Sequence, residues 1–186
     1  MRKLFGGMVL ATALLSLPAM ASAQRRASAS MGGAEHELGV DLGAAYVKPN
    51  GISGGIVFVT PVDVRFGFVP RSGKVMWEPR GTLLISTVGG TTTYEITPSI
   101  NVLYANSTGG HRQGMYFMGG AGLDLADNGT NSGTMVQLGA GVGWRKPYGS
   151  GAWRYELMFQ WTSENTTLGR PSTIAIGGRI GISLWH

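Results

Sequence analysis

The chain has 186 residues, of which 43% are hydrophobic and 13% are charged, and it contains no cysteine. Its formal net charge of +5 is too small a basic excess to indicate nucleic-acid binding. The absence of cysteine excludes disulfides and thiolate metal sites, so the fold must be held by packing and by polar pairing.

The first 23 residues have the layout of a secretory signal peptide. Arg2 and Lys3 precede an apolar stretch at 4–17, and a small-x-small triplet occupies 21–23. The apolar run of about 14 residues is shorter than the roughly 20 needed to span a bilayer, which argues against a membrane anchor. We therefore predict export with cleavage after Ala23, which leaves 163 of the 186 residues and suits one domain.

After a flexible tail predicted at 24–36, the rest of the chain follows one pattern. Segments of about 10–14 residues alternate apolar and polar side chains, and clusters of Gly, Pro, Asn and Ser separate them. The pattern predicts eight strands, at 37–47, 61–69, 75–88, 92–105, 114–126, 134–146, 152–163 and 173–186. The start of the second strand is unmarked, because 54–60 is apolar at both parities. Pro61 and Pro98 each require a bulge or an unpaired position within a strand.

Each segment has an apolar face and a polar face. The residues predicted for the apolar face near the C-terminus are Phe159, Trp161, Ile174, Ile176, Ile180, Ile182 and Leu184. Alternation alone does not separate a soluble barrel, whose apolar face points inward, from a membrane barrel, whose apolar face points to lipid.

The polar face distinguishes these alternatives. Its charged residues are Asp41, Asp63, Arg65, Glu78, Arg80, Glu95, Asp124, Arg145, Arg154, Glu156 and Arg179. Acids and bases nearly balance, and every base is arginine, whereas Lys48, Lys74 and Lys146 fall in predicted turns. A confined interior requires charge balance and favours the bidentate guanidinium group. We predict an interior ionic network of Asp63, Arg65, Glu78, Arg80, Glu95, Arg154, Glu156 and Arg179.

The expected fold is all-β: an eight-stranded antiparallel up-and-down transmembrane β-barrel over 37–186, with its apolar face in lipid. Aromatic residues near the strand ends fit the girdles at membrane interfaces. An eight-stranded barrel has no room for an aqueous channel, so the charges are expected to fill it as a plug. The alternative is a soluble periplasmic barrel with inverted faces that binds an apolar ligand.

With these features the chain resembles the small eight-stranded outer-membrane barrels of Gram-negative bacteria, the OmpA/OmpX-like group, over 37–186. The resemblance implies a place in the cell outer membrane, contact with outer-membrane lipid and with the barrel assembly machinery, and no cofactor. It also implies a non-enzymatic role in the envelope or at short surface loops, of which 163–171 is the longest. That family usually ends in an aromatic residue, whereas this chain ends in His186, with Trp185 out of phase.

Residues 115–186 also resemble the outer-membrane lipid A deacylase family, which bears a His-x-Ser-Asn motif on its penultimate strand. Ser163 matches the nucleophile of that motif. Trp161 stands in place of the base, and an indole N–H cannot accept a proton. Glu164 replaces the Asn, and no acid follows Ser172 to orient a base. We therefore predict no catalytic residues, and a degenerate deacylase remains an alternative; the scattered histidines indicate no metal site.

Overall fold

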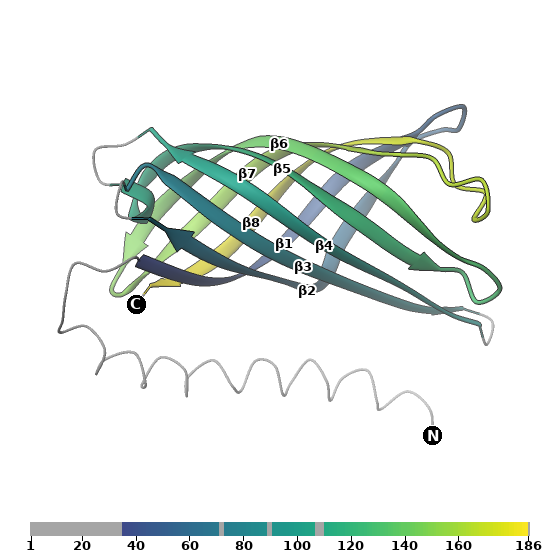
Figure 1. Cartoon of the computed structure of the whole chain (residues 1–186), viewed down its shortest axis with the longest axis horizontal. Coiled ribbons are helices and arrows are strands. Elements are labelled where there is room, and N and C mark those ends of the chain that lie inside the picture. The colour runs from purple at the N-terminus through teal and green to yellow at the C-terminus, as the bar shows by residue number, and fades with distance from the viewer. Residues whose placement is uncertain (1–34, 71–72, 89–90, 107–109, 186) are drawn as a thin grey trace, which may run out of the picture. The chain divides into compact units, whose positions relative to one another are not determined.

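The computed structural model describes residues 35–70, 73–88, 91–106 and 110–185 (Figure 1). The predicted signal peptide, most of the predicted tail and His186 lie outside these ranges. The elements are β1 (Glu35–Pro49), β2 (Gly55–Val69), β3 (Val75–Val88), β4 (Thr91–Ala105), the 3₁₀ turn η1 (Gly110–Arg112), β5 (Gly114–Asp127), β6 (Ser132–Tyr148), β7 (Gly151–Thr162) and β8 (Thr173–Trp185).

The strands form one closed antiparallel barrel. Each strand pairs with the next in sequence, and β8 pairs with β1 along its whole length, from Glu37↔Trp185 to Pro49↔Thr173. The predicted eight-stranded up-and-down barrel is therefore confirmed. In the described part of the chain, no helix is long and apolar enough to cross a membrane.

Several strands extend beyond their predicted limits. β2 begins at Gly55, six residues before the predicted 61, and Glu35 and His36 belong to β1 rather than to the tail. Lys48 and Lys146, predicted in turns, lie within β1 and β6. The difference arises because pairing with a neighbour extends a strand past its last alternating residue, as in the pair Val47↔Gly55.

Pro61 and Pro98, the two prolines predicted to disturb their strands, both interrupt a hydrogen-bonding ladder, as their missing N–H requires. The β1–β2 register shifts between Asp41 and Gly43, opposite the segment that contains Pro61. The β4–β5 ladder skips from Ile96 to Ser99, across Pro98.

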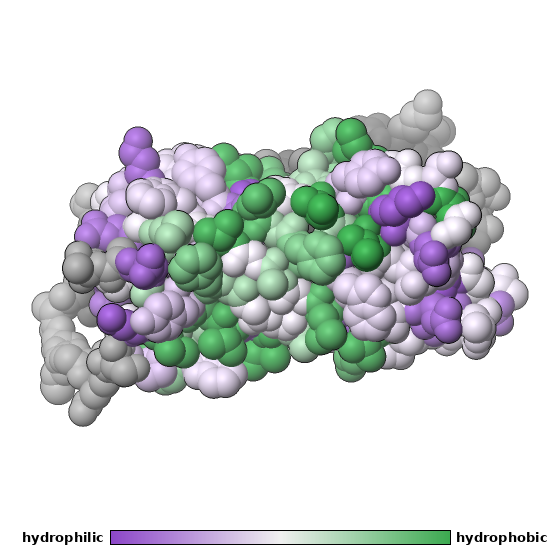
Figure 2. Space-filling view, turned by 90° about the horizontal axis from the view of Figure 1, so that it is seen from above, coloured by the Kyte–Doolittle hydropathy of each residue, from purple (hydrophilic) through white to green (hydrophobic). Residues whose placement is uncertain are grey.

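The outer wall is apolar and the inner wall is polar over most of the barrel. Apolar side chains gather over its middle, with hydrophilic ones toward both ends (Figure 2). On β4 the outward-facing aromatic residues Tyr94 and Tyr104 lie near opposite ends of the strand.

The two ends of the barrel differ (Figure 1). The start of β1 and the end of β8 lie at one end, here called the terminal end. The opposite end, here called the loop end, carries the β1–β2, β5–β6 and β7–β8 connections. The interior toward the terminal end is closed by an apolar cluster of Val69, Met76, Leu103, Tyr116, Met118 and Trp185.

Trp185 belongs to this cluster and is buried inside the barrel. Trp185 points into the barrel and Leu184 points outward, because neighbouring residues of a strand point to opposite faces. The Arg145 guanidinium lies over the Trp185 ring, with the Arg145 Cζ atom 5.5 Å from the centre of the ring.

Candidate functional site in the barrel interior

Ten charged residues meet inside the barrel, and we call them the ionic plug. They are Glu37, Asp41, Asp63, Arg65, Glu78, Arg80, Arg145, Arg154, Glu156 and Arg179. They come from β1, β2, β3, β6, β7 and β8, because the inner parity of each strand carries them to the same interior. Five acids face five arginines, so the formal charges of the plug cancel.

The plug is a continuous chain of ion pairs. Arg145 Nη2 lies 2.6 Å from Glu37 Oε2, and Arg65 Nε lies 2.8 Å from Asp41 Oδ2. Arg65 also pairs with Glu37, so two arginines share one carboxylate.

The pairing continues across the barrel to β3, β7 and β8. Arg154 pairs with Glu78 and donates from Nε to Glu156 Oε1 at 2.8 Å. Arg80 Nε lies 3.0 Å from Asp63 Oδ1, and Arg179 Nε lies 3.6 Å from Asp63 Oδ2. A carboxylate accepts at both oxygens, which lets five acids hold five guanidinium groups in a connected network.

Uncharged polar groups fill the remaining positions around the plug. The Tyr116 hydroxyl donates to Glu156 Oε1 at 2.8 Å, and the Arg145 guanidinium lies 4.6 Å from the centre of the Tyr116 ring. The Ser183 hydroxyl donates to Glu37, and the Asn101 amide donates to Glu78 at 3.4 Å. Burying so many charges is tolerable only because their partners are in place.

The structure brings seven of the eight predicted network residues into the plug, and Glu95 is the exception. Glu95 accepts from Arg170 Nη1 at 2.9 Å, and Asp124 Oδ2 lies 4.0 Å from the same nitrogen. We call these three residues the mouth cluster, which lies toward the loop end and apart from the plug. The prediction placed Glu95 by parity, and parity gives the face of a strand but not the height along the barrel.

Four residues were left out of the predicted interior network. Asp41 and Arg145 were predicted only for the polar face, and Glu37 and Arg170 were not singled out at all. The inner parity of β1 indicates Glu37, which pairs with Arg65 and Arg145. Arg170 had no such signal, because it lies in the β7–β8 connection. The isolated bridge Asn165↔Arg170 closes this connection into a turn, and from that turn the Arg170 guanidinium reaches Glu95 on β4.

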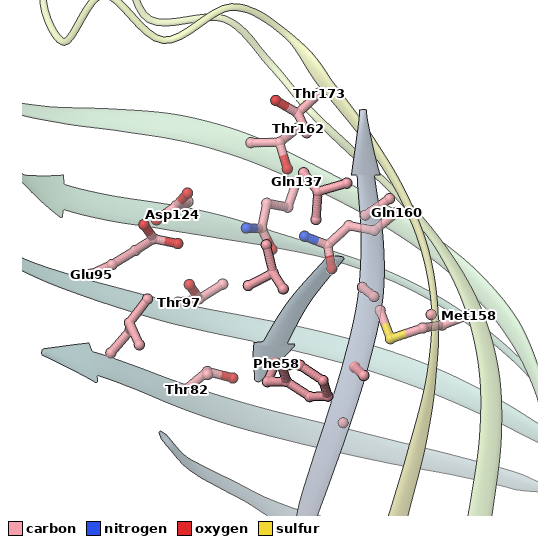
Figure 3. A pocket seen from close by; sticks show the side chains of 18 of the residues that line it. Phe58, Thr82, Glu95, Thr97, Asp124, Gln137, Met158, Gln160, Thr162 and Thr173 are labelled. Carbon is pink, nitrogen blue, oxygen red and sulfur yellow. The ribbon is translucent and has the colours of Figure 1, made fainter. Parts of the chain in front are cut away.

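A pocket of about 330 Å³ lies between the plug and the mouth cluster (Figure 3). The amide groups of Gln137 and Gln160 point into it, and the carboxyl groups of Glu95 and Asp124 lie beside each other at its edge. Arg179 lines the side nearest the plug. The volume is at the lower end of the range for small-molecule sites, so the interior has room for a compact group.

His111 lies in η1, outside the strands, and is 3% exposed. Burial, together with the nearby Arg145 guanidinium, lowers the pKa of His111 to about 4. In the unfolded chain this pKa is about 6.5. Between pH about 4 and about 6.5, His111 is protonated in the unfolded chain and neutral in the folded chain. The stability that His111 contributes therefore rises with pH through this range and is lost on acidification.

We expect a His111→Gln variant to lose less stability than the parent protein between pH about 6.5 and about 4. The measurement is the urea midpoint of both proteins across this range. The carboxylates titrate in both proteins, so the difference between the two profiles isolates His111. Parallel profiles would contradict the assignment.

The residues predicted to face lipid all lie on the outer parity. Ile174, Ile176, Ile180 and Phe159 are exposed on the outer wall, and Trp161 is partly exposed. The partly exposed residues at the terminal end of β8 are Ile182 and Leu184.

Ser163 forms two hydrogen bonds with Val136 on β6. Its hydroxyl accepts from the Val136 N–H at 3.0 Å, and its own N–H donates to the Val136 carbonyl at 2.9 Å. The side chain therefore extends the β6–β7 pairing past the end of β7. Within the described residues, no group of three or more histidine, cysteine or acidic side chains is arranged to hold a metal ion.

The fold is a closed eight-stranded antiparallel barrel, and the solved structures similar to it are small eight-stranded barrels of bacterial outer membranes. The crystal structure of Neisserial surface protein A (NspA) is similar to this chain with a TM-score of 0.56 at 12% identity, over 82% of this chain and 98% of that one. The crystal structure of Ail, the attachment invasion locus protein of Yersinia pestis, is similar with a TM-score of 0.50 at 9% identity, over 83% and 99% of the two chains.

These likenesses extend over nearly the whole of both known structures and establish the fold. Searches against models of protein families and against curated proteins found no match.

Proposed function

We propose that the chain is a non-enzymatic outer-membrane protein that spans the bilayer as a plugged barrel and has a structural role in the envelope. The observation that carries the proposal is the division of the two walls, with charges inside and apolar side chains outside. In water this arrangement would expose a continuous apolar surface, which a soluble protein avoids. In a bilayer the same surface replaces lipid–lipid contacts.

The height of the apolar wall supports this placement. Tyr94 and Tyr104 both face outward on β4 and are ten residues apart. At about 3.4 Å per residue and a tilt of about 40°, this separation is about 25 Å along the barrel axis. That distance matches the apolar band between the aromatic girdles of outer-membrane barrels.

The plug supports a structural rather than a conducting role. Arg65, Arg145 and Arg154 are fully buried with their acids across the barrel. An eight-stranded barrel has an interior only wide enough for side chains, and here paired charges occupy it. The partners of such a protein are outer-membrane lipid and the barrel assembly machinery, with cleavage after Ala23 during export.

The placement is tested by expressing the full chain, extracting the membrane fraction in mild detergent and comparing boiled with unboiled samples by gel electrophoresis. We expect a heat-dependent change in mobility, because a closed barrel in detergent stays folded until its hydrogen-bonded strands are melted. Recovery in the soluble periplasmic fraction, with no mobility change, would refute the membrane placement. N-terminal sequencing of the extracted protein, expected to start at Gln24, tests the cleavage site.

A further inference from the structure

The barrel wall is incomplete between β2 and β3 toward the loop end. The two strands pair from Phe68↔Trp77 to Val62↔Leu83. Beyond that point β2 keeps its pairing with β1 as far as Gly55, and β3 keeps its pairing with β4 as far as Val88. Among the described residues, no ladder pair joins these outer portions of β2 and β3 to each other.

The interior pocket reaches this opening. It is lined by Val57 and Phe58 on β2 and by Thr82 and Leu84 on β3, one strand on each side of the gap. Val57 and Leu84 have inward parity, yet they are 46% and 40% exposed, whereas inward-facing Met135 elsewhere in the pocket is 2% exposed. The exposure follows from the missing strand pairing, and it leaves apolar side chains at the rim.

The opening lies at the depth of the apolar wall. Phe58 pairs with Ala44, two residues closer to the middle of the barrel than the pair Tyr46↔Ile56. On the other side Leu84 pairs with Glu95, next to the outward-facing Tyr94. The rim thus lies just inside the aromatic residues at the loop end, where acyl chains surround an outer-membrane barrel.

Opposite the apolar rim, the pocket offers hydrogen-bond donors around one arginine. Arg179 has its nearest acid, Asp63, at 3.6 Å, whereas the other four plug arginines each have an acid oxygen within 3.0 Å. Its guanidinium therefore keeps donors available on the pocket side. The Gln137 and Gln160 amides and the Thr82 hydroxyl line the same cavity.

From this geometry we propose that the opening between β2 and β3 admits a long-chain fatty acid from the membrane. The carboxylate enters the pocket and is held by Arg179, since a planar guanidinium matches a carboxylate. The apolar chain leaves between Phe58 and Leu84 into the lipid. The cavity is small enough to exclude a bulky head group. At the mouth, the Arg170 guanidinium is already paired with Glu95, which leaves Arg179 as the arginine for the carboxylate.

The test uses the full chain reconstituted in phosphatidylcholine vesicles, with a palmitic acid that carries a diazirine close to its carboxyl end. After illumination, mass spectrometry maps the adducts on the rim, at Val57, Phe58 and Leu84, and on the outer wall at Ile176. Unlabelled palmitic acid and methyl palmitate serve as competitors. Matched variants are Arg179→Gln and Arg112→Gln, the latter an arginine outside the pocket.

Saturable labelling of the rim, about tenfold or more better competition by the acid than by the ester, and a loss of similar size in Arg179→Gln would support the proposal. Labelling at Ile176 should not saturate and should be equal in all variants. Equal, non-saturable labelling at both places, or equal competition by the ester, would overturn it.

The heat-dependent mobility of each sample shows whether it has folded. If Arg179→Gln does not fold, the comparison of acid with ester still decides whether a carboxylate is recognised. This inference rests on the membrane placement proposed above, and the two can fail separately. A protein that shows no mobility shift and no adduct at Ile176 would refute the placement itself.

Discussion

Replacement of Arg154 by alanine will lower the free energy of unfolding by about 3–5 kcal/mol. Arg154 is fully buried and pairs with Glu78 and Glu156. Removing the guanidinium leaves these carboxylates in the interior without their main positive partner. The cost of burying the unpaired negative charge exceeds what was gained from the ion pair itself. The measurement is the urea midpoint and slope of the refolded barrel.

Arg112→Ala is the matched control, because it removes the same side chain from an exposed ion pair. Arg112 Nε lies 3.3 Å from Glu35 Oε2, and both side chains are about half exposed, at 51% and 45%. Exposed pairs contribute about 0–1 kcal/mol, so its midpoint should stay close to that of the parent protein. Equal midpoints for the two variants would mean that the plug does not stabilise the barrel.

The second large effect is expected from a single methyl group on β6. Gly143→Ala will destabilise the barrel by about 1–3 kcal/mol, because its Cβ would overlap the Tyr116 ring. That ring has little freedom to move, since its hydroxyl donates to Glu156 and both Arg145 and Arg154 lie against it.

Gly139→Ala provides the control four residues away on the same strand and the same inner face. A Cβ at Gly139 would have its nearest neighbour, the Phe159 carbonyl oxygen, at 3.5 Å, which is an ordinary contact. We expect this variant to be unchanged or slightly stabilised, since alanine costs less chain entropy than glycine. If both substitutions have the same effect, Tyr116 is not fixed in the way described.

Much of the barrel follows from the alternation of residues along single strands. The period of two places Ile174 and Ile176 outside and Arg179 inside without reference to any neighbour. The limits of β3 were predicted at 75–88 and observed there, because turn residues flank an unbroken alternating segment. The start of β2 was missed, since 54–60 is apolar at both parities.

Contacts between strands were harder to predict. Parity indicates that Glu95 and Glu78 both face inward, but strand tilt and register put one in the mouth cluster and the other in the plug. The gap between β2 and β3 has no sequence signature of its own beyond Pro61. It depends on how far two distant ladders, β1–β2 and β3–β4, diverge after Val62 and Leu83.

The sequence by itself determined the number of strands, the two faces of each strand and the balance of charge on the inner face, because these are properties of local periodicity and composition. Only the tertiary structure decided which acid meets which arginine, where a pocket remains and where the wall opens. Those features depend on the register between strands, and the free energy of register is shared among all eight strands of the closed barrel.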